Sequence, residues 1–142
     1  MRIHRLISIG LGAYLLLPAS SMAAEAISIE PGMWEITTKM TTSMFPQPRV
    51  ETTQECMKDS EIGPDDLVPD DGGDCTITES KVSGNSMDWT MQCNSPGGVM
   101  TGGGNFTSKG NSGHGNMSMN MNIEGQSITM EMAWEGKRTG SC

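Results

Sequence analysis

The sequence predicts an all-β domain of about seven antiparallel strands, mostly in a meander, curled into a small barrel or half-barrel and held by two disulfides. Three observations predict this fold. Apolar and polar residues alternate with a period of two over most of the chain after Trp34. Turn-forming Gly, Pro, Asn and Ser clusters separate these runs. The cysteines number four, as two disulfides require.

The N-terminus has the pattern of a secretory signal peptide. A short basic segment precedes an uncharged stretch at 6–17, and small residues follow up to Ala23 and Ala24. The uncharged stretch of about 12 residues is too short to cross a bilayer as a helix, although a membrane anchor or a buried helix is the alternative. We therefore expect cleavage near Ala23 or Ala24, which removes residues 1–24. Residues 25–142 then form one periplasmic or secreted domain without an integral membrane segment.

The composition restricts the partners. The chain carries 17 acidic and 9 basic residues, a formal net charge of −8. Such a surface repels the phosphates of nucleic acid and of anionic lipid, so neither is an expected partner. A cationic ligand or a basic protein is compatible with this charge.

Methionine replaces leucine as the main apolar residue. The chain has 14 methionines, whereas Leu67 is the only leucine after the signal pattern. The flexible thioether suits core filling, but so small a core needs covalent support. Cys56, Cys75, Cys93 and Cys142 predict two disulfides in an oxidising compartment. No C-x-x-C spacing occurs, so neither a redox pair nor a zinc ribbon is indicated.

The first half of the domain is less regular. Residues 34–40 alternate as a strand, Phe45–Pro48 interrupts the pattern, and residues 50–56 predict a second, more polar strand. Residues 57–74 are rich in Asp, Glu, Pro and Gly, and predict an acidic loop with a helical turn near 57–62.

A hairpin is predicted next, with its turn centred on Gly84. This register ranks one disulfide pairing first among three, because opposed Cβ atoms lie near disulfide reach, and Cys56 is then left with Cys142. A two-residue turn would break the match. The expected opposite residues are Cys75 with Cys93, Ile77 with Met91, and Glu79 with Trp89.

The C-terminal half continues as strands. A turn at 94–98, a glycine-rich strand at 99–108 and a turn at 109–113 lead to the clearest hairpin, with Gly125-Gln126 as its loop. The expected opposite residues are Ile123 with Ile128, Met121 with Met130, Met119 with Met132, and Met117 with Trp134. If the acidic loop crosses from end to end, the last strand runs antiparallel to the first, with Cys56 and Cys142 at one end.

Four segments carry a family resemblance. They are Pro31-Gly32-Met33-Trp34-Glu35, Gln54-Glu55-Cys56, the hairpin from Cys75 through Trp89 to Cys93, and the ending from Gly136 to Cys142. In these the chain resembles an uncharacterised family of exported bacterial proteins, domain of unknown function 3617. Lys137 stands where the family pattern has an arginine. The resemblance covers almost the whole mature chain and implies export and a single β-rich domain, but no activity.

Catalytic and metal signatures are weak. His114 is the only histidine after the signal pattern, and no nucleophile motif accompanies it. The acidic run at 70–74 lacks the spacing of a calcium-binding EF-hand loop, so a solvated loop is favoured. We expect no enzymatic activity, with a hydrolase as a third choice, and no cofactor.

The methionine face of the last hairpin carries the sharpest hypothesis. Thioethers select Cu(I), and the candidate ligands are Met117, Met119, Met121, Met130 and Met132. The alternative is that this face is simply core. Small exported barrels also hold apolar ligands, and Gly102 and Gly104 would leave room for one. We expect a non-enzymatic protein that binds a small apolar ligand or a protein partner, with Cu(I) binding as the alternative.

Overall fold

The computed structural model describes residues 26–68 and 74–142. The expected signal peptide and residues 69–73 of the acidic loop lie outside the described residues. Within the described ranges, no helix is long and apolar enough to cross a membrane.

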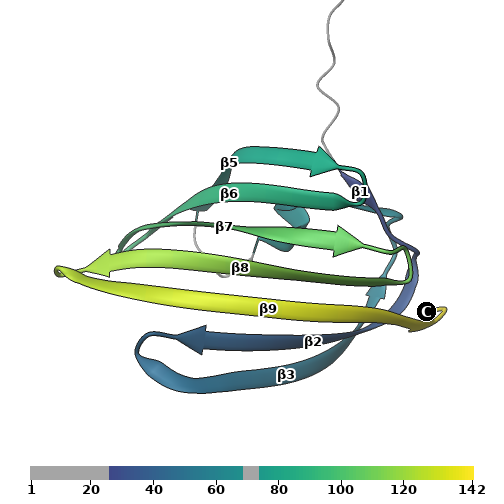
Figure 1. The fold of residues 1–142 in the computed structure, drawn as a ribbon, viewed down its shortest axis with the longest axis horizontal. Coiled ribbons are helices and arrows are strands. Elements are labelled where there is room, and N and C mark those ends of the chain that lie inside the picture. The colour runs from purple at the N-terminus through teal and green to yellow at the C-terminus, as the bar shows by residue number, and fades with distance from the viewer. Residues whose placement is uncertain (1–25, 69–73) are drawn as a thin grey trace, which may run out of the picture.

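One antiparallel sheet of seven strands makes up most of the domain (Figure 1). Its order is β3-β2-β9-β8-β7-β6-β5. Strands β5 to β9 form a meander, and β9 closes against β2. The two edges, β3 and β5, do not pair with each other, so the curled sheet is a half-barrel. The all-β prediction is confirmed, and the open form is the one that applies. The strands are β2 (Gly32–Thr42), β3 (Phe45–Met57), β5 (Asp74–Ser83), β6 (Ser86–Ser95), β7 (Gly98–Ser108), β8 (Ser112–Ile123) and β9 (Gln126–Gly140).

The predicted interruption at Phe45–Pro48 is wrong. Strand β3 already begins at Phe45, after a short turn at 43–44, and the backbone N–H of Phe45 donates to Oγ1 of Thr42 at 3.1 Å. Proline is tolerated here because β3 is an edge strand, where a missing N–H need not remove a ladder hydrogen bond.

The helical turn expected near 57–62 is also misplaced. Residue 57 ends β3, Glu61–Ile62 form the short strand β4, and the turn of 3₁₀ helix lies at Pro64–Leu67. Pro64 stands at the first helical position, where its missing N–H costs nothing. The Asp66 carboxylate accepts from the N–H of Gly63 at 2.7 Å and stabilises this start.

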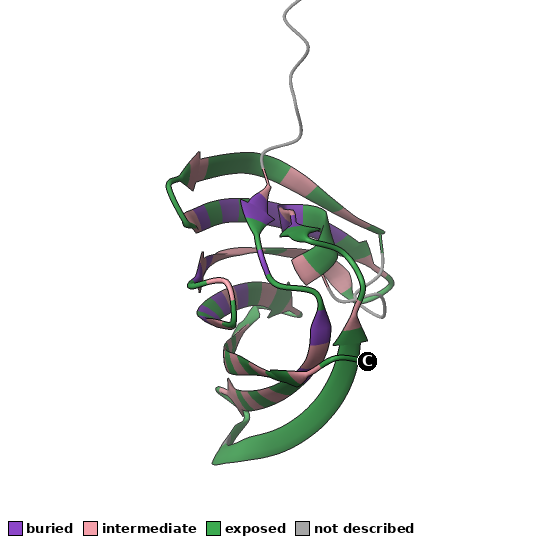
Figure 2. Ribbon diagram, turned by 90° about the vertical axis from the view of Figure 1, so that its right-hand side faces the viewer, coloured by how far each residue is buried: buried purple, intermediate pink, exposed green. Residues whose placement is uncertain are grey.

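A cover, defined as residues 26–31 and 58–68, lies across one half of the concave face (Figure 2). Its strand β1 (Ile27–Ser28) pairs with β4. The buried Ser108 hydroxyl donates to the carbonyl of Ser28 at 2.7 Å, and the indole Nε1 of Trp34 donates to the carbonyl of Glu30 at 2.9 Å. These bonds pair polar groups that burial would otherwise leave unsatisfied.

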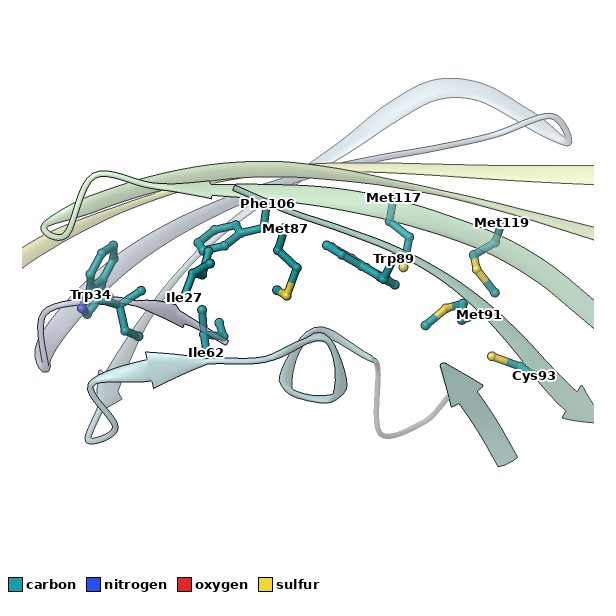
Figure 3. Close-up of a cluster of buried hydrophobic side chains, with 11 residues drawn as sticks. Ile27, Trp34, Ile62, Met87, Trp89, Met91, Cys93, Phe106, Met117 and Met119 are labelled. Atoms are coloured by element: carbon teal, nitrogen blue, oxygen red, sulfur yellow. The ribbon is translucent and has the colours of Figure 1, made fainter. Parts of the chain in front are cut away.

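The core lies between this cover and the sheet (Figure 3). Ile27 and Ile62 of the cover belong to the same buried cluster as Trp34, Met87 and Phe106 of the sheet. Met87 is completely buried. The apolar row continues along β6 and β8 beyond the cover, as Figure 3 shows.

Two tryptophans of the concave face stand directly opposite glycines. Trp89 faces Gly104, and Trp134 faces Gly115, so each indole ring can lie flat over a strand without a side chain beneath it. The two rings lie 6.4 Å apart. Nε1 of Trp89 is buried without an acceptor among the described residues, so this indole contributes through its apolar surface rather than through a hydrogen bond.

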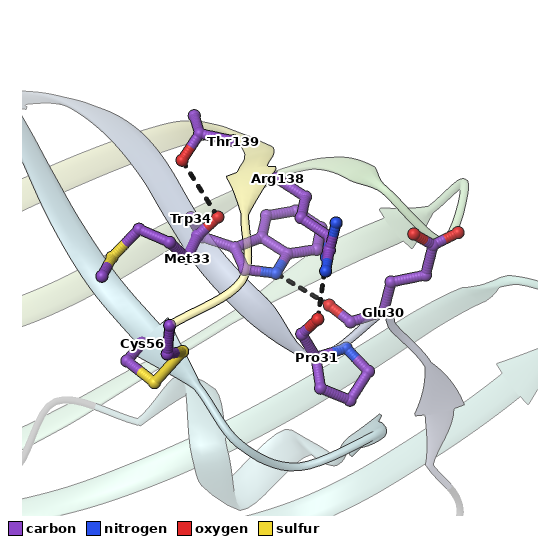
Figure 4. The surroundings of a disulfide bond; sticks show 8 residues. Glu30, Pro31, Met33, Trp34, Cys56, Arg138 and Thr139 are labelled. Carbon is purple, nitrogen blue, oxygen red and sulfur yellow. Dashed lines mark hydrogen bonds between the residues drawn. A yellow bond between two sulfur atoms is a disulfide. The ribbon is translucent and has the colours of Figure 1, made fainter.

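Two disulfides staple opposite ends of the sheet. Cys56 is bonded to Cys142 and Cys75 to Cys93. Figure 4 shows the first bond beside the start of β2, where Nε of Arg138 donates to the carbonyl of Pro31 at 2.8 Å and Oγ1 of Thr139 donates to that of Met33 at 3.2 Å. Disulfides are typical of proteins in an oxidising compartment.

Replacement of Gly104 by alanine tests the tryptophan–glycine packing. The added Cβ would stand 2.7 Å from Cζ2 of Trp89 and closer still to the backbone carbonyl oxygen of Asn116. Because the indole ring and the neighbouring strand must both give way, we expect a loss of about 1–3 kcal/mol in the free energy of unfolding. Urea denaturation measures it. Gly97→Ala is the control, because its nearest contact would be Oγ of Ser95 at 3.9 Å. Equal effects of the two substitutions would contradict this packing.

The two disulfides should contribute unequally to stability. Their sequence separations are 86 and 18 residues, and the chain-entropy model gives about 4–5 kcal/mol for the longer loop and about 3 kcal/mol for the shorter. We expect Cys56→Ala/Cys142→Ala to lower the denaturation midpoint more than Cys75→Ala/Cys93→Ala. The reverse order would show that native packing around Cys93, rather than loop closure, decides the contribution.

Candidate functional site

An apolar groove occupies the half of the concave face that the cover does not reach. We call it the methionine groove; its cavity volume is about 570 Å³. Among the described residues that line it, eight are methionines and none is charged. The lining consists of Met40, Cys75, Met91, Cys93, Ser95, Pro96, Met100, Met117, Met119, Met121, Ile128, Met130 and Met132.

Strands β8 and β9 supply six of the thirteen described residues that line the groove. Alternate residues of each strand point to the concave face, as the sequence pattern predicts. In the ladder, Met117 lies opposite Met132 and Met119 opposite Met130. Four thioether side chains therefore form two directly opposed pairs in the floor of the groove.

The predicted register of this hairpin is wrong by two positions. Ile123 lies opposite Gln126 rather than Ile128, and the expected partners of Met121, Met119 and Met117 shift accordingly. The turn consists of Glu124 and Gly125, which both have positive φ, 50° and 84°. Such a two-residue turn matches the twist of the strands. Because the shift is an even number of residues, the methionines stay on the same face.

Burial divides the methionines into two groups. Met91, Met117 and Met119 are buried, with 2%, 4% and 8% of their surface exposed. Met40, Met100, Met121, Met130 and Met132 are only half-buried. The expectation that this face is core therefore describes the first group, whereas the second group lines an open surface.

The Cys75–Cys93 disulfide forms one wall of the groove. Cys75 lies opposite Cys93 and Ile77 opposite Met91, but the expected pairing of Glu79 with Trp89 is wrong. The turn is a two-residue turn that pairs Ser83 with Ser86, and a β-bulge between Ile77 and Glu79 restores the register needed by the cysteines. No residue pattern in the sequence indicated this bulge.

The opposite wall ends in polar residues of β3. Arg49 lies opposite Met40, and Glu51 opposite Thr38, so both charged side chains belong to the concave side of the edge strand and both are exposed. The groove is thus bordered by charge on this side, while its own lining is uncharged.

The other candidate residues do not form a site. His114 is exposed and lies opposite Glu135, on the convex face. Among the described residues, no group of three or more His, Cys, Asp or Glu side chains could hold a metal ion. Most of the acidic run proposed as a calcium ligand, residues 70–73, lies outside the described residues.

The comparisons with known proteins give one match. The model of the family described as "Protein of unknown function (DUF3617)" matches residues 29–142, which includes both disulfides and the whole sheet. The chain belongs to this family. No curated protein and no solved structure matches it.

The residues that match the DUF3617 model include the whole lining of the groove, but the family description assigns no role to it. Sequence reasoning did not connect Met40, Met91 and Met100 with the methionines of the last hairpin. Each stands on an apolar face of its own strand, so their alternation was visible. The curl of the sheet brings them together, because it places the apolar faces of these strands at the same end of the concave side.

Proposed function

We propose that this DUF3617 protein is an exported, non-enzymatic binding protein that holds a small apolar ligand in the methionine groove. The observation that carries the proposal is the part of the concave face that the described cover residues leave open and that no described charged residue lines. Its volume of about 570 Å³ lies within the roughly 300–1,000 Å³ of typical ligand sites.

The half-buried methionines support a binding role over a purely structural one. A core side chain gains stability by leaving water completely, whereas five methionines of the groove keep part of their surface exposed. An apolar ligand would bury them. Their flexible thioethers adapt to ligands of different shape, as in other promiscuous apolar sites.

The compartment follows from two independent features. The two disulfides favour an oxidising location, and the N-terminal pattern favours export with cleavage near Ala23 or Ala24. Together they support a periplasmic or secreted protein. An apolar segment of a protein partner is the other occupant that this groove would accept.

A charge placed in the groove tests the proposal. N-Phenyl-1-naphthylamine, whose fluorescence rises in apolar surroundings, should bind the parent chain and be displaced by long-chain fatty acids or alcohols. Met130→Glu should weaken binding by at least about tenfold, or about 1.4 kcal/mol, because the ligand would bury an unpaired charge.

The matched control is Ala133→Glu, an exposed position on the other face of the same strand. It introduces the same charge and should leave the dye affinity unchanged. Dye binding that is absent from the parent, or equally reduced in both variants, would contradict the assignment of the ligand to the groove.

Cu(I) binding is the second candidate, favoured by the two opposed pairs Met117–Met132 and Met119–Met130. Titration of the oxidised protein with Cu(I) against a competing chelator should then show tight binding that Met119→Leu/Met130→Leu abolishes. Leucine keeps the apolar volume and removes the sulfur, so dye binding should survive in this variant. Loss of both activities would indicate a misfolded groove instead.

A further inference from the structure

The groove uses a side chain with chemistry that an apolar site does not need. Leucine would provide the same apolar surface, yet among the described residues Leu67 is the only leucine and eight methionines line the groove. Apart from metal binding and a more flexible side chain, methionine differs from leucine in that its sulfur can be oxidised to a polar sulfoxide.

Burial determines which methionines an oxidant can reach. Met40, Met100, Met121, Met130 and Met132 are half-buried in an open groove. Met87, Met91 and Met117 are at most 4% exposed. One chain therefore contains accessible and protected thioethers on the same apolar face, with the accessible ones at the ligand surface.

We propose that the half-buried methionines of the groove are an oxidation site, and that their conversion to sulfoxides releases the apolar ligand. A thioether sulfur attacks one oxygen of a peroxide. An S–O bond forms, the O–O bond breaks, and for hydrogen peroxide the second oxygen leaves as water after proton transfer. The sulfur loses two electrons, and the peroxide gains them.

The consequence for binding follows from polarity. Each sulfoxide places a strongly polar oxygen in a lining that has no charged group and few hydrogen-bond donors to satisfy it. A bound apolar ligand would bury that oxygen without a partner, which is unfavourable. The oxidised groove should prefer water. Because methionine oxidation is reversible by dedicated reductases, such a release would be reversible. This inference rests on the proposed function.

The test treats the protein, with both disulfides formed, with millimolar hydrogen peroxide. It measures both the peptide masses and the affinity for N-phenyl-1-naphthylamine. We expect sulfoxide at Met121, Met130 and Met132 well before Met87 or Met91, together with at least a tenfold loss of dye affinity. In Met40→Leu/Met100→Leu/Met121→Leu/Met130→Leu/Met132→Leu, no half-buried groove thioether remains to be oxidised. The dye affinity of this variant is compared before and after treatment, and treatment should lower it by less than about twofold, whereas the parent loses at least about tenfold.

Met44→Leu is the internal control. Met44 is 59% exposed in the turn between β2 and β3 and does not line the groove. In the parent, Met44 should be oxidised readily without effect on dye binding. Met44→Leu should therefore lose as much dye affinity on peroxide treatment as the parent does. Oxidation of the groove methionines with unchanged dye affinity would overturn the inference and leave the proposed function standing. Failure of the untreated parent to bind dye would overturn both the inference and the proposed function. Oxidation of buried and half-buried methionines at the same rate would refute the selective oxidation site.

Discussion

An open sheet with one apolar face must shield that face from water, and the structure depends on how this requirement is met. The cover shields the half of the concave face next to the Cys56–Cys142 bond. It is held by hydrogen bonds from Ser108 and Trp34 to cover carbonyls and by the antiparallel pair of β1 and β4. The other half has no such layer among the described residues, and it is there that the groove lies.

The groove and the core are parts of one surface. Met117 and Met119 are buried members of the core cluster and also line the groove, while Met130 and Met132, directly opposite them, are half-buried. Ligand binding and folding stability therefore share side chains. A substitution at a buried methionine would change both properties, whereas one at a half-buried methionine changes chiefly the surface offered to a ligand.

The glycines opposite tryptophans show how the curl and the core depend on each other. Gly104 and Gly115 let the rings of Trp89 and Trp134 lie close to the neighbouring strands. Glycine in a strand weakens it as an isolated element. The large apolar area of each indole compensates for this, and the strand remains part of the sheet.

Sequence alternation was sufficient to predict the seven long strands, apart from the start of β3, and the face on which the methionines of the last hairpin lie. Chain direction predicted the two ends of the sheet at which the cysteine pairs lie. These are properties of period two and of chain direction, which are local. Register was not. The β-bulge near Thr78 and the turn at Glu124–Gly125 each shifted predicted partners. Alternation alone is compatible with two registers that differ by two residues, so it does not select the turn. The even shift in the last hairpin left its faces unchanged.

The sequence by itself therefore determined an all-β, disulfide-bonded domain with a methionine-rich apolar face. Only the tertiary structure decided which methionines are core and which are open to a ligand. That distinction depends on where the cover segments lie. They are brought to one end of the half-barrel by contacts between residues far apart in the sequence, such as Ser28 with Ser108, which are 80 positions apart. Such contacts leave no periodic signal in the chain.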